Sequence, residues 1–210
     1  MSIQLNIKNI KESIQKTCLI VVTKNQNINT IKKVHNLGER DFGENKVQIL
    51  IKKKKELPDD IRWHMIGHLQ KNKVKLIAPF IYMIQSVDSL SLLSKINQLA
   101  MKNNRIINCL IQIKIAKEKS KYGFTLKEAD ELLTSNYKIE YPNINIKGIM
   151  GMATFCKNPQ QIESEFKSMK KTLKLLKSKN PIFSIGMSND YEIACHCGSN
   201  MIRIGSAIFN

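Results

Sequence analysis

The residue best suited to covalent chemistry stands directly after a short apolar run. Lys24 follows the run from Cys18 to Val22, and a lysine amine becomes a nucleophile once it loses its proton. An unperturbed lysine has a pKa of about 10.4, so burial at an apolar opening would lower that pKa and free the amine. The alternative interpretation, a solvated lysine at the end of a strand, stays open.

A turn near the C-terminus has the composition of an anion site. Phosphate is bound by converging N–H groups, often at the start of a helix. In residues 186–192, Asn189 and Glu192 have the spacing of a helix-capping pair, which would leave the amide and the hydroxyl of Ser188 free to face an anion. In the other interpretation Ser188 is itself the helix cap.

The last apolar run, Met201 to Ile204, contains an arginine and ends in a small turn. Arg203 is flanked by two isoleucines, and a permanently charged guanidinium in that setting needs an acceptor. A core carboxylate is one such acceptor. Gly205 and Ser206 follow, and glycine lets the backbone amides approach a ligand closely. An ordinary exit from the strand is the alternative.

These residues must be positioned by regular elements, and strand-length apolar runs alternate with stretches of helical period along the whole chain. Helical periodicity is clear at Ile28 to Leu37, stopped by Gly38, at Leu90 to Met101, and at Gln161 to Leu176. The predicted strands are Cys18–Val22, Arg40–Gly43, Arg62–Ile66, Ile81–Val87, Ile106–Ile115, Ile146–Met150, Ile182–Ile185 and Met201–Ile204.

Strands that alternate with helices favour a parallel sheet with right-handed crossovers, and eight such units close into a (β/α)₈ TIM barrel. We therefore expect α/β architecture in one domain over residues 1–210, with a doubly wound open sheet as the alternative. In a barrel, chemistry lies at the carboxyl ends of the strands. Besides the residues already named, that rule selects Glu44, Asn45, His68, Asp88 and Met187.

The net charge of +17 invites a nucleic-acid interpretation. Nearly all of the cations are lysines, and Lys, Ile and Asn are together what AT-rich codons supply, so mutational bias explains the excess at least as well. We interpret the run Lys52 to Lys55 as a solvated helix face. Aromatic residues, at 6%, offer few platforms for base stacking.

Composition also bears on location. The five cysteines are scattered singly, as free thiols in a reducing compartment would be, and Cys195, His196 and Cys197 do not share one helix face for a metal. The longest apolar run is too short to span a membrane, and the N-terminus lacks the layout of a secretory signal. We expect a cytoplasmic protein without a metal site.

An ordered set of motifs resembles the pyridoxal phosphate homeostasis protein family, single barrels related to the N-terminal domain of alanine racemase. The resemblance runs from near residue 18 to the C-terminus. The chain has Thr23 where the family usually has Ser, and Asn200 where it usually has Thr. The matching segments are residues 20–24 (IVVTK), 42–48 (FGENKVQ), 63–73 (WHMIGHLQKNK), 86–88 (SVD), 120–123 (SKYG), 148–150 (GIM), 186–190 (GMSND) and 202–209 (IRIGSAIF).

The resemblance implies a barrel of the alanine racemase N-terminal type that holds pyridoxal 5′-phosphate as a Schiff base on Lys24. It implies a phosphate site at Ser188, Gly205 and Ser206, with Met187 in the same turn, and it places Arg203 opposite the pyridine nitrogen. For Asn45 and His64 two interpretations stay open: they line the cofactor, or they are structural polar residues. Met150, Met152 and Met187 are most simply core residues.

We therefore expect a protein that holds and delivers the cofactor without turnover of its own, acting as a monomer with transient contacts to apoenzymes. The rival from the enzyme class is an amino-acid racemase. Racemisation by two bases needs a second acid/base group on the opposite cofactor face, which alanine racemase takes from a further domain, and this sequence ends at Asn210. Specific nucleic-acid binding is the distant alternative.

Overall fold

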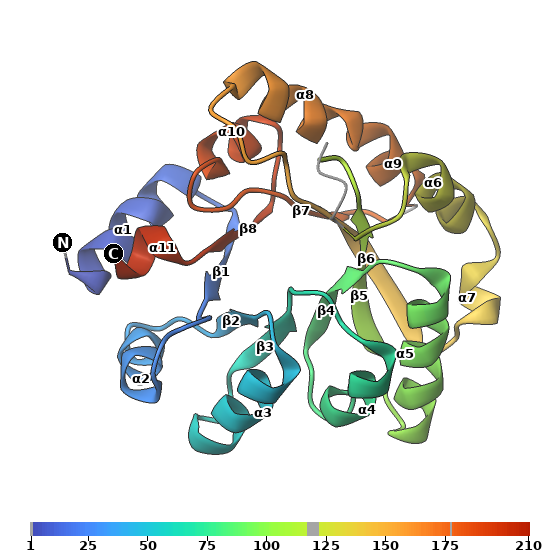
Figure 1. Ribbon diagram of the computed structural model, residues 1–210, viewed down its shortest axis with the longest axis horizontal. Coiled ribbons are helices and arrows are strands. Elements are labelled where there is room, and N and C mark those ends of the chain that lie inside the picture. Colours follow the sequence, from blue (N-terminus) through green and yellow to red (C-terminus); the bar gives the residue numbers. More distant parts are fainter. Residues whose placement is uncertain (1, 117–121, 177) are drawn as a thin grey trace.

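The computed structural model describes residues 2–116, 122–176 and 178–210, and its centre is a closed barrel of eight parallel strands in chain order, β1 to β8 (Figure 1). The predicted TIM barrel is confirmed, and the open sheet is wrong. The motif residues Ser120 and Lys121 lie outside the described residues. The strands are β1 (Cys18–Val22), β2 (Asp41–Glu44), β3 (Arg62–Met65), β4 (Met83–Val87), β5 (Ile107–Ile113), β6 (Ile144–Gly151), β7 (Ile182–Ser184) and β8 (Met201–Ile204).

Each predicted strand corresponds to an observed one, and β1 and β8 have the predicted bounds. The largest differences lie at β4 and β5, which are shorter than predicted, and at β6, which is longer. Since β4 and β5 lie within apolar segments, hydrophobicity does not mark where strand pairing stops. Pairing of β5 with β6 also shifts register between Cys109 and Leu110.

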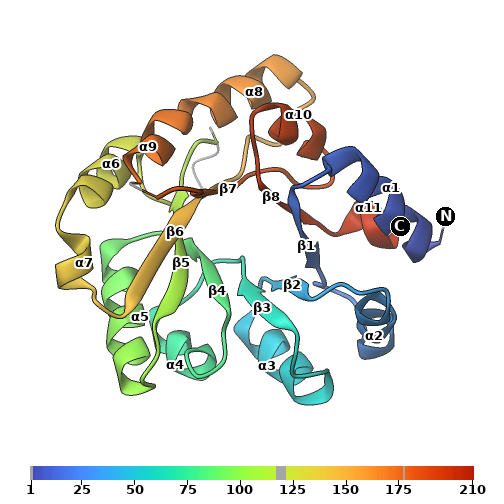
Figure 2. The same ribbon diagram turned by 180° about the vertical axis from the view of Figure 1, so that it is seen from behind.

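Helices surround the barrel on its outside, as the two opposite views show (Figures 1 and 2). The predicted helix Ile28–Leu37 is present as α2 and is followed by Gly38 at φ +98°, a value that favours glycine. The helices are α1 (Ile3–Ile14), α2 (Ile28–Asn36), α3 (Val47–Glu56), η1 (Lys71–Lys73), α4 (Val74–Ile77), α5 (Leu90–Lys102), α6 (Leu126–Thr134), α7 (Tyr137–Glu140), α8 (Pro159–Ser168), α9 (Lys170–Leu175), α10 (Tyr191–His196) and α11 (Ser206–Phe209).

The predicted helix Gln161–Leu176 is divided at Met169 into α8 and α9. Met169 is fully buried against β6, where the side chain fills the space that Gly151 leaves open. A Cβ atom at Gly151 would lie 2.6 Å from the Met169 sulfur. Helical periodicity continues across the division, so the pattern of apolar residues does not reveal it.

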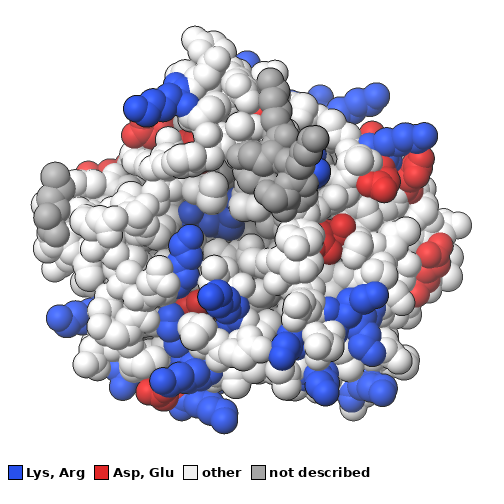
Figure 3. Space-filling model, in the orientation of Figure 1, with Lys and Arg blue, Asp and Glu red and all other residues white. Residues whose placement is uncertain are grey.

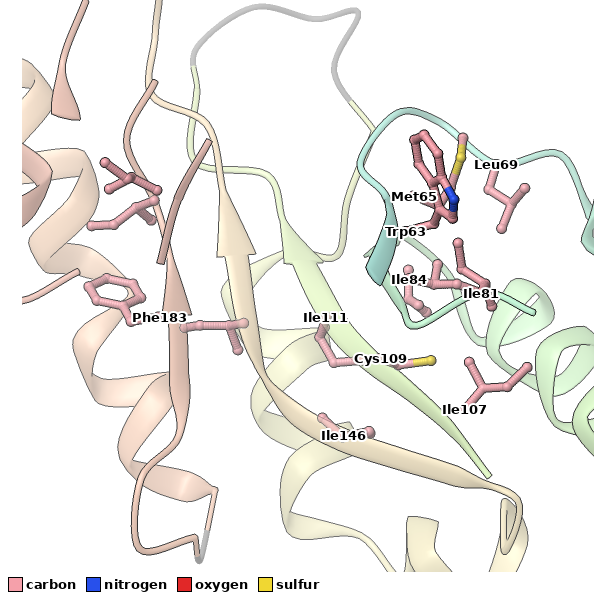
Figure 4. Close-up of a cluster of buried hydrophobic side chains, with 14 of the residues drawn as sticks. Trp63, Met65, Leu69, Ile81, Ile84, Ile107, Cys109, Ile111, Ile146 and Phe183 are labelled. Carbon is pink, nitrogen blue, oxygen red and sulfur yellow. The ribbon is translucent and has the colours of Figure 1, made fainter. Parts of the chain in front are cut away.

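The hydrophobic core has two parts. The larger part lies between the outside of the barrel and the helices, and Figure 4 shows a portion of it around Trp63, Ile84 and Cys109. The smaller part fills the barrel interior and consists of Ile20, Met83, Leu110, Met150 and Met201, with Cys18, Met152 and Ile182 packed against it. The expectation of a core residue is therefore confirmed for Met150, whereas Met152 is half-buried against this cluster and Met187 is half-buried outside both clusters.

The two ends of the described chain lie together. Helices α1 and α11 are neighbours in both ribbon views, and Nδ2 of Asn6 donates a hydrogen bond to the carbonyl oxygen of Ile208 at 3.0 Å (Figures 1 and 2). Asn6 is buried. This contact secures the turn after β8, which carries two of the predicted site residues. Among the described helices, none is long and apolar enough to cross a membrane.

Candidate functional site

Lys24 lies at the carboxyl end of the barrel. The ladder from β1 continues through Thr23, whose amide donates to the carbonyl oxygen of Gly43 at 3.0 Å. Side chains alternate along a strand, and Cys18 and Ile20 face the barrel interior. Lys24 lies two residues beyond β1, in the turn that begins the loop at this end of the barrel. Its side chain is exposed, so the burial considered for the amine is not found and the alternative of a solvated lysine fits this structure.

Thr23 faces the opposite way and contacts a buried ion pair. The hydroxyl of Thr23 donates to Oε1 of Glu44 at 2.5 Å, and Nζ of Lys53 donates to the same oxygen at 2.6 Å. Both charged side chains are buried beneath α3. Two expectations are therefore wrong: Glu44 does not face the opening, and Lys53 is not part of a solvated face. Because side chains alternate between the two faces of a strand, the side chain of Glu44 on β2 faces outward from the barrel.

The turns after β7 and β8 meet at the Ser188 hydroxyl. Oγ of Ser188 accepts hydrogen bonds from the backbone amides of Ala207, at 3.2 Å, and Gly205, at 3.4 Å. The sequence prediction brought Ser188 together with this turn correctly, although the second amide belongs to Ala207 and the Ser206 side chain is exposed. Gly205 precedes α11, and the first amides of a helix lack intrahelical partners.

The predicted capping pair of Asn189 and Glu192 is wrong. Helix α10 has Asp190 at its N-cap, and the Asp190 carboxylate instead accepts the amide of Met187 at 2.6 Å. The residue three positions after Asp190 is Ile193, which cannot complete a capping box. The alternative that Ser188 caps the helix is wrong as well. Asp190 holds the turn in which the Ser188 hydroxyl faces the backbone amides that follow β8.

Arg203 is buried in the barrel interior and has its hydrogen-bond partners on neighbouring strands. Nη1 donates to the Ser184 carbonyl oxygen at 2.8 Å and to its Oγ at 2.6 Å, while Nη2 donates to the Gly151 carbonyl oxygen at 2.9 Å. All three acceptors are neutral, so the core carboxylate considered as a partner of Arg203 is not among them. Burial lowers the pKa of Arg203 to about 10, and the negative charge of Asp190 acts against that shift.

His64 lies inside the barrel, and both of its ring nitrogens have partners. Nε2 lies 3.0 Å from Oδ1 of Asp41, and Nδ1 lies 3.1 Å from Nε2 of Gln85. Burial lowers the pKa of His64, although the Asp41 carboxylate acts in the other direction. This arrangement fits the structural interpretation of His64.

Asn45 and Met187 are half-buried residues at the barrel opening. The backbone of Asn45 passes close to the next loop, since a Cβ atom at Gly67 would lie 2.4 Å from the Asn45 carbonyl oxygen. Met187 follows Gly186, which has φ +96°. These two residues therefore lie on the rim that the loops after β2 and β7 form.

A second pair of candidates meets on the same rim. Nδ1 of His68 lies 2.8 Å from a carboxylate oxygen of Asp88, and the His68 ring stacks on Tyr122 with 3.7 Å between ring centroids. The sequence rule placed His68 and Asp88 at the ends of neighbouring strands, β3 and β4, and the structure brings them into contact.

Asn200 lies at the other end of the barrel, immediately before β8. Its Oδ1 accepts the amide of Phe183 at 2.7 Å, and its Nδ2 donates to the carbonyl oxygen of Pro181 at 2.9 Å. The side chain thus joins β7 to β8 far from the turns at the carboxyl ends. The side chain of Asn200 therefore does not contact the candidate residues Ser188, Gly205 and Ser206.

Metal ligands do not gather in the described part of the chain, where no group of three His, Cys, Asp or Glu side chains could hold an ion. Cys197 is buried at the end of α10, and its thiol donates to the carbonyl oxygen of Glu163 at 3.9 Å. The five cysteines are free thiols.

Sequence reasoning missed the polar residues inside the barrel. Asp41 begins β2, Gln85 lies in the middle of β4 and Ser184 ends β7. A polar side chain at an inward-facing position of a short buried strand indicates such a residue, because a buried polar group requires a hydrogen-bond partner. Arg203 was found by that clue, and the same reasoning applied to β4 and β7 would have found its neighbours.

A closed barrel of eight parallel strands, with Lys24, the turn at Ser188 and the buried Arg203 near its carboxyl end, defines the class of (β/α)₈ barrels with candidate site residues at that end. Comparison with known proteins makes the class specific. Residues 1–210 match the family described as "Alanine racemase, N-terminal domain", and the chain belongs to this family. The relatives include a pyridoxal phosphate homeostasis protein of Aquifex aeolicus, 32% identical over 97% of this chain and 95% of the relative. Another, from Helicobacter pylori, is 36% identical over 91% of this chain and 86% of its own length.

Solved structures agree with this assignment. PipY of Synechococcus elongatus superposes with a TM-score of 0.91 at 26% identity and covers all of both chains. A second structure of that protein, with pyridoxal phosphate bound, gives a TM-score of 0.88. Alanine racemase of Bartonella henselae shares the fold, with a TM-score of 0.78 at 17% identity, and this chain covers 58% of it.

Proposed function

We propose that this protein binds pyridoxal 5′-phosphate through Lys24 and serves in the homeostasis and delivery of the cofactor, without a turnover reaction of its own. The relatives named for this role cover nearly the whole chain, and PipY is described with the cofactor bound. When bound, the cofactor supplies an aldehyde that a lysine amine captures reversibly as a Schiff base.

The donor set fits an anionic, aromatic cofactor. A phosphate requires N–H and O–H donors, which the amides of Gly205 and Ala207 and the hydroxyl of Ser188 supply. A pyridine nitrogen can accept a hydrogen bond from a cation. Arg203 is suited to that role because its three acceptors are neutral and leave its positive charge uncompensated. The Arg203 side chain reaches the end of the barrel at which Lys24 follows β1, since its acceptors Gly151 and Ser184 are the last residues of β6 and β7.

One observation carries the proposal. Two backbone amides from the turn after β8 converge on a single oxygen atom, Oγ of Ser188, which belongs to the turn after β7. This is the arrangement that a phosphate oxygen requires, and phosphate sites of barrels are often found in these two loops.

The remaining candidates have defined roles in this proposal. Asn45 and Met187 border the cofactor from the rim. Ser206 contributes through its backbone, because its side chain is exposed. His64 acts at a distance, since both of its nitrogens are occupied by Asp41 and Gln85.

The proposal extends to the setting of the protein. We propose a monomer in the cytoplasm that transfers the cofactor through transient contacts with apoenzymes. Size-exclusion chromatography with light scattering tests the monomer, and a mass near 48 kDa in place of 24.1 kDa would contradict it, since that is twice the chain mass. Activation of a cofactor-free enzyme, faster with the loaded protein than with free cofactor at equal concentration, tests delivery.

The test of the site is a spectroscopic titration with pyridoxal phosphate, followed by borohydride reduction and peptide mapping. We expect a visible absorption band for the bound cofactor and a reduced label on Lys24. Lys24→Ala should abolish both, while phosphate binding survives, because the amides across the ring are unchanged. Lys46→Ala, at an exposed lysine next to the rim residue Asn45, is the matched control. A label on another lysine would overturn the assignment.

The same preparation distinguishes holding from catalysis. A racemase would convert L-alanine to D-alanine many times per protein molecule, whereas a cofactor carrier should produce no more than trace amounts. A chiral assay of the loaded protein with excess L-alanine measures the difference. Sustained turnover would replace the carrier proposal with the racemase alternative.

A further inference from the structure

A continuous chain of hydrogen bonds crosses the barrel interior from Arg203 to the opposite end. Arg203 on β8 donates to Oγ of Ser184 on β7, at 2.6 Å, and that hydroxyl donates to Oε1 of Gln85 on β4, at 2.7 Å. Gln85 Nε2 reaches Nδ1 of His64 on β3 at 3.1 Å, and His64 Nε2 reaches Oδ1 of Asp41 on β2 at 3.0 Å.

Every link in this chain has one possible direction. A guanidinium can only donate, so Ser184 Oγ accepts from Arg203, and its own proton is directed to Gln85 Oε1. The Gln85 amide nitrogen then faces His64 and must donate to Nδ1. This leaves the proton of the neutral His64 ring on Nε2, where it is donated to the carboxylate of Asp41.

The far end of the chain is held by a charged pair. Asp41 also accepts from Nε of Arg62 at 2.7 Å. Burial raises the pKa of the Asp41 carboxyl, but the hydrogen bonds from Arg62 and His64 outweigh that effect and hold the pKa at about 2. A carboxylate that stays ionised fixes the direction of each bond between it and Arg203.

The three middle members are fully buried, at 0% exposure for His64, Gln85 and Ser184, and each is uncharged in this arrangement. The ionised carboxylate at the end of this hydrogen-bond chain is therefore separated from Arg203 by three neutral side chains. The chain fixes the position of the guanidinium without neutralising its charge. A direct ion pair would fix the position equally well but would leave less charge for a ligand.

We propose that Ser184, Gln85 and His64 are positioning residues that hold Arg203, with its charge available, against the ring of the bound cofactor. This inference rests on the proposed function. It adds that the strength and the pH dependence of cofactor binding are set by residues deep in the barrel that do not touch the cofactor.

Two substitutions at Gln85 test the chain in different ways. Gln85→Met keeps the length of the side chain and removes the hydrogen bonds to Ser184, His64 and the Met201 sulfur, so the Ser184 hydroxyl that accepts from Arg203 is no longer oriented. Gln85→Glu keeps an acceptor for Ser184 but brings a negative charge between Arg203 and His64, which raises the pKa of His64 and competes for the guanidinium. Met83→Leu is the matched control, because Met83 faces the same interior cluster from the same strand.

The first measurement needs no cofactor. Nitrogen-15 NMR of histidine-labelled protein, with His64 assigned from a His64→Gln spectrum, should show protonated Nε2 and unprotonated Nδ1 throughout neutral pH. In Gln85→Glu we expect His64 to become doubly protonated on mild acidification, and in Met83→Leu we expect the wild-type spectrum. A wild-type His64 with its proton on Nδ1 would overturn the direction of the chain.

The second measurement is the affinity for pyridoxal phosphate and the pH dependence of the bound absorption band. We expect roughly tenfold weaker binding for Gln85→Met, in which the Ser184 hydroxyl loses its acceptor, and for Gln85→Glu, in which the new carboxylate competes for the guanidinium, with a displaced pH profile in both. If wild type and Met83→Leu bind while the Gln85 variants match them in affinity and profile, the inference fails. If wild type itself does not bind, the proposed function fails instead.

Ser184→Ala provides a second route if the Gln85 variants do not fold. It removes one oxygen atom and leaves Arg203 its two carbonyl acceptors. We expect weaker cofactor binding than in wild type, and a displacement of the pH profile of the bound absorption band in the same direction as in Gln85→Met. Unchanged binding and profile in Ser184→Ala would overturn the inference by itself.

Discussion

The ammonium nitrogen of Lys53 lies 2.8 Å from the backbone carbonyl oxygen of Thr23, the residue immediately before Lys24. Lys53 comes from α3 and is also paired with Glu44. A buried ion pair contributes little net stability compared with apolar residues, but it holds its hydrogen-bond partners in one geometry. The contact therefore connects the position of Lys24 to a helix on the outside of the barrel.

Lys53→Met should destabilise the protein by about 3 to 5 kcal/mol, because it leaves the Glu44 carboxylate buried without its cation. Glu44 Oε2 already has no hydrogen-bond partner among the described residues. Urea unfolding measures the change in the free energy of unfolding. Lys55→Met is the control, since Lys55 is an exposed member of the same lysine run and should have little effect. Equal stability of the two variants would contradict the importance of the buried pair.

Ser188→Ala should weaken retention of pyridoxal phosphate by about tenfold, equivalent to about 1.4 kcal/mol, while the visible band still forms at saturating cofactor. The substitution removes one phosphate donor and leaves the amides of Gly205 and Ala207 in place. Fluorescence or absorption titration measures the affinity. Asn189→Ala is the adjacent control: Asn189 is exposed and does not cap α10, so its removal should leave the affinity unchanged. A loss with Asn189→Ala as large as that with Ser188→Ala would contradict the role given to the Ser188 hydroxyl.

The barrel was predictable because its strands and helices follow one another with clear changes in hydrophobic period. Strand β1 could be bounded correctly since Thr23 and Lys24 interrupt its apolar run at the end of the strand. The division of a helix at Met169 could not, because it depends on the space above Gly151, a residue 18 positions earlier in the chain.

The candidate site was predictable where the chemistry of a side chain restricts where it can lie. Arg203 among isoleucines requires an acceptor in any fold, but the identity of that acceptor depends on Ser184 and Gly151, which only the closed barrel brings to it. Lys53 was assigned to solvent because a run of four lysines resembles a surface. Its burial follows from helical spacing, since Lys53 lies three residues after the buried Leu50 on the inward face of α3, and from its partner Glu44, which the lysine run itself does not reveal.

Acid should remove the stabilisation provided by Asp41. The folded pKa, about 2, lies below the ordinary value of 3.8, so the ionised carboxylate stabilises the fold at neutral pH, and this contribution is lost as pH falls from about 4 to 2. Asp41→Asn should therefore lose on the order of 1 to 2 kcal/mol at pH 7, an amount reduced by solvent screening, and should match wild type near pH 2. Urea unfolding at several pH values gives the comparison. Asp59→Asn, at a carboxyl whose side chain is 95% exposed, is the control and should follow wild type throughout. If Asp41→Asn lost as much free energy of unfolding at pH 2 as at pH 7, the assigned dependence of stability on the Asp41 carboxylate would be contradicted.

The net charge of +17 should produce only weak, salt-sensitive binding to nucleic acid. Figure 3 shows Lys and Arg side chains spread over the visible face with Asp and Glu between some of them, and two of the protein's cations, Lys53 and Arg203, are buried in internal contacts. Scattered charges bind a duplex by releasing counterions, so the logarithm of the affinity falls linearly with the logarithm of the salt concentration. For several phosphate contacts, the affinity falls by roughly a thousandfold between 50 and 200 mM salt.

A titration of labelled duplexes of different sequence should show this slope and no sequence preference. Lys24→Ala should bind the duplexes as wild type does while losing the cofactor band. Binding that keeps a sequence preference at about 0.15 M salt would instead give the positive charge a function of its own.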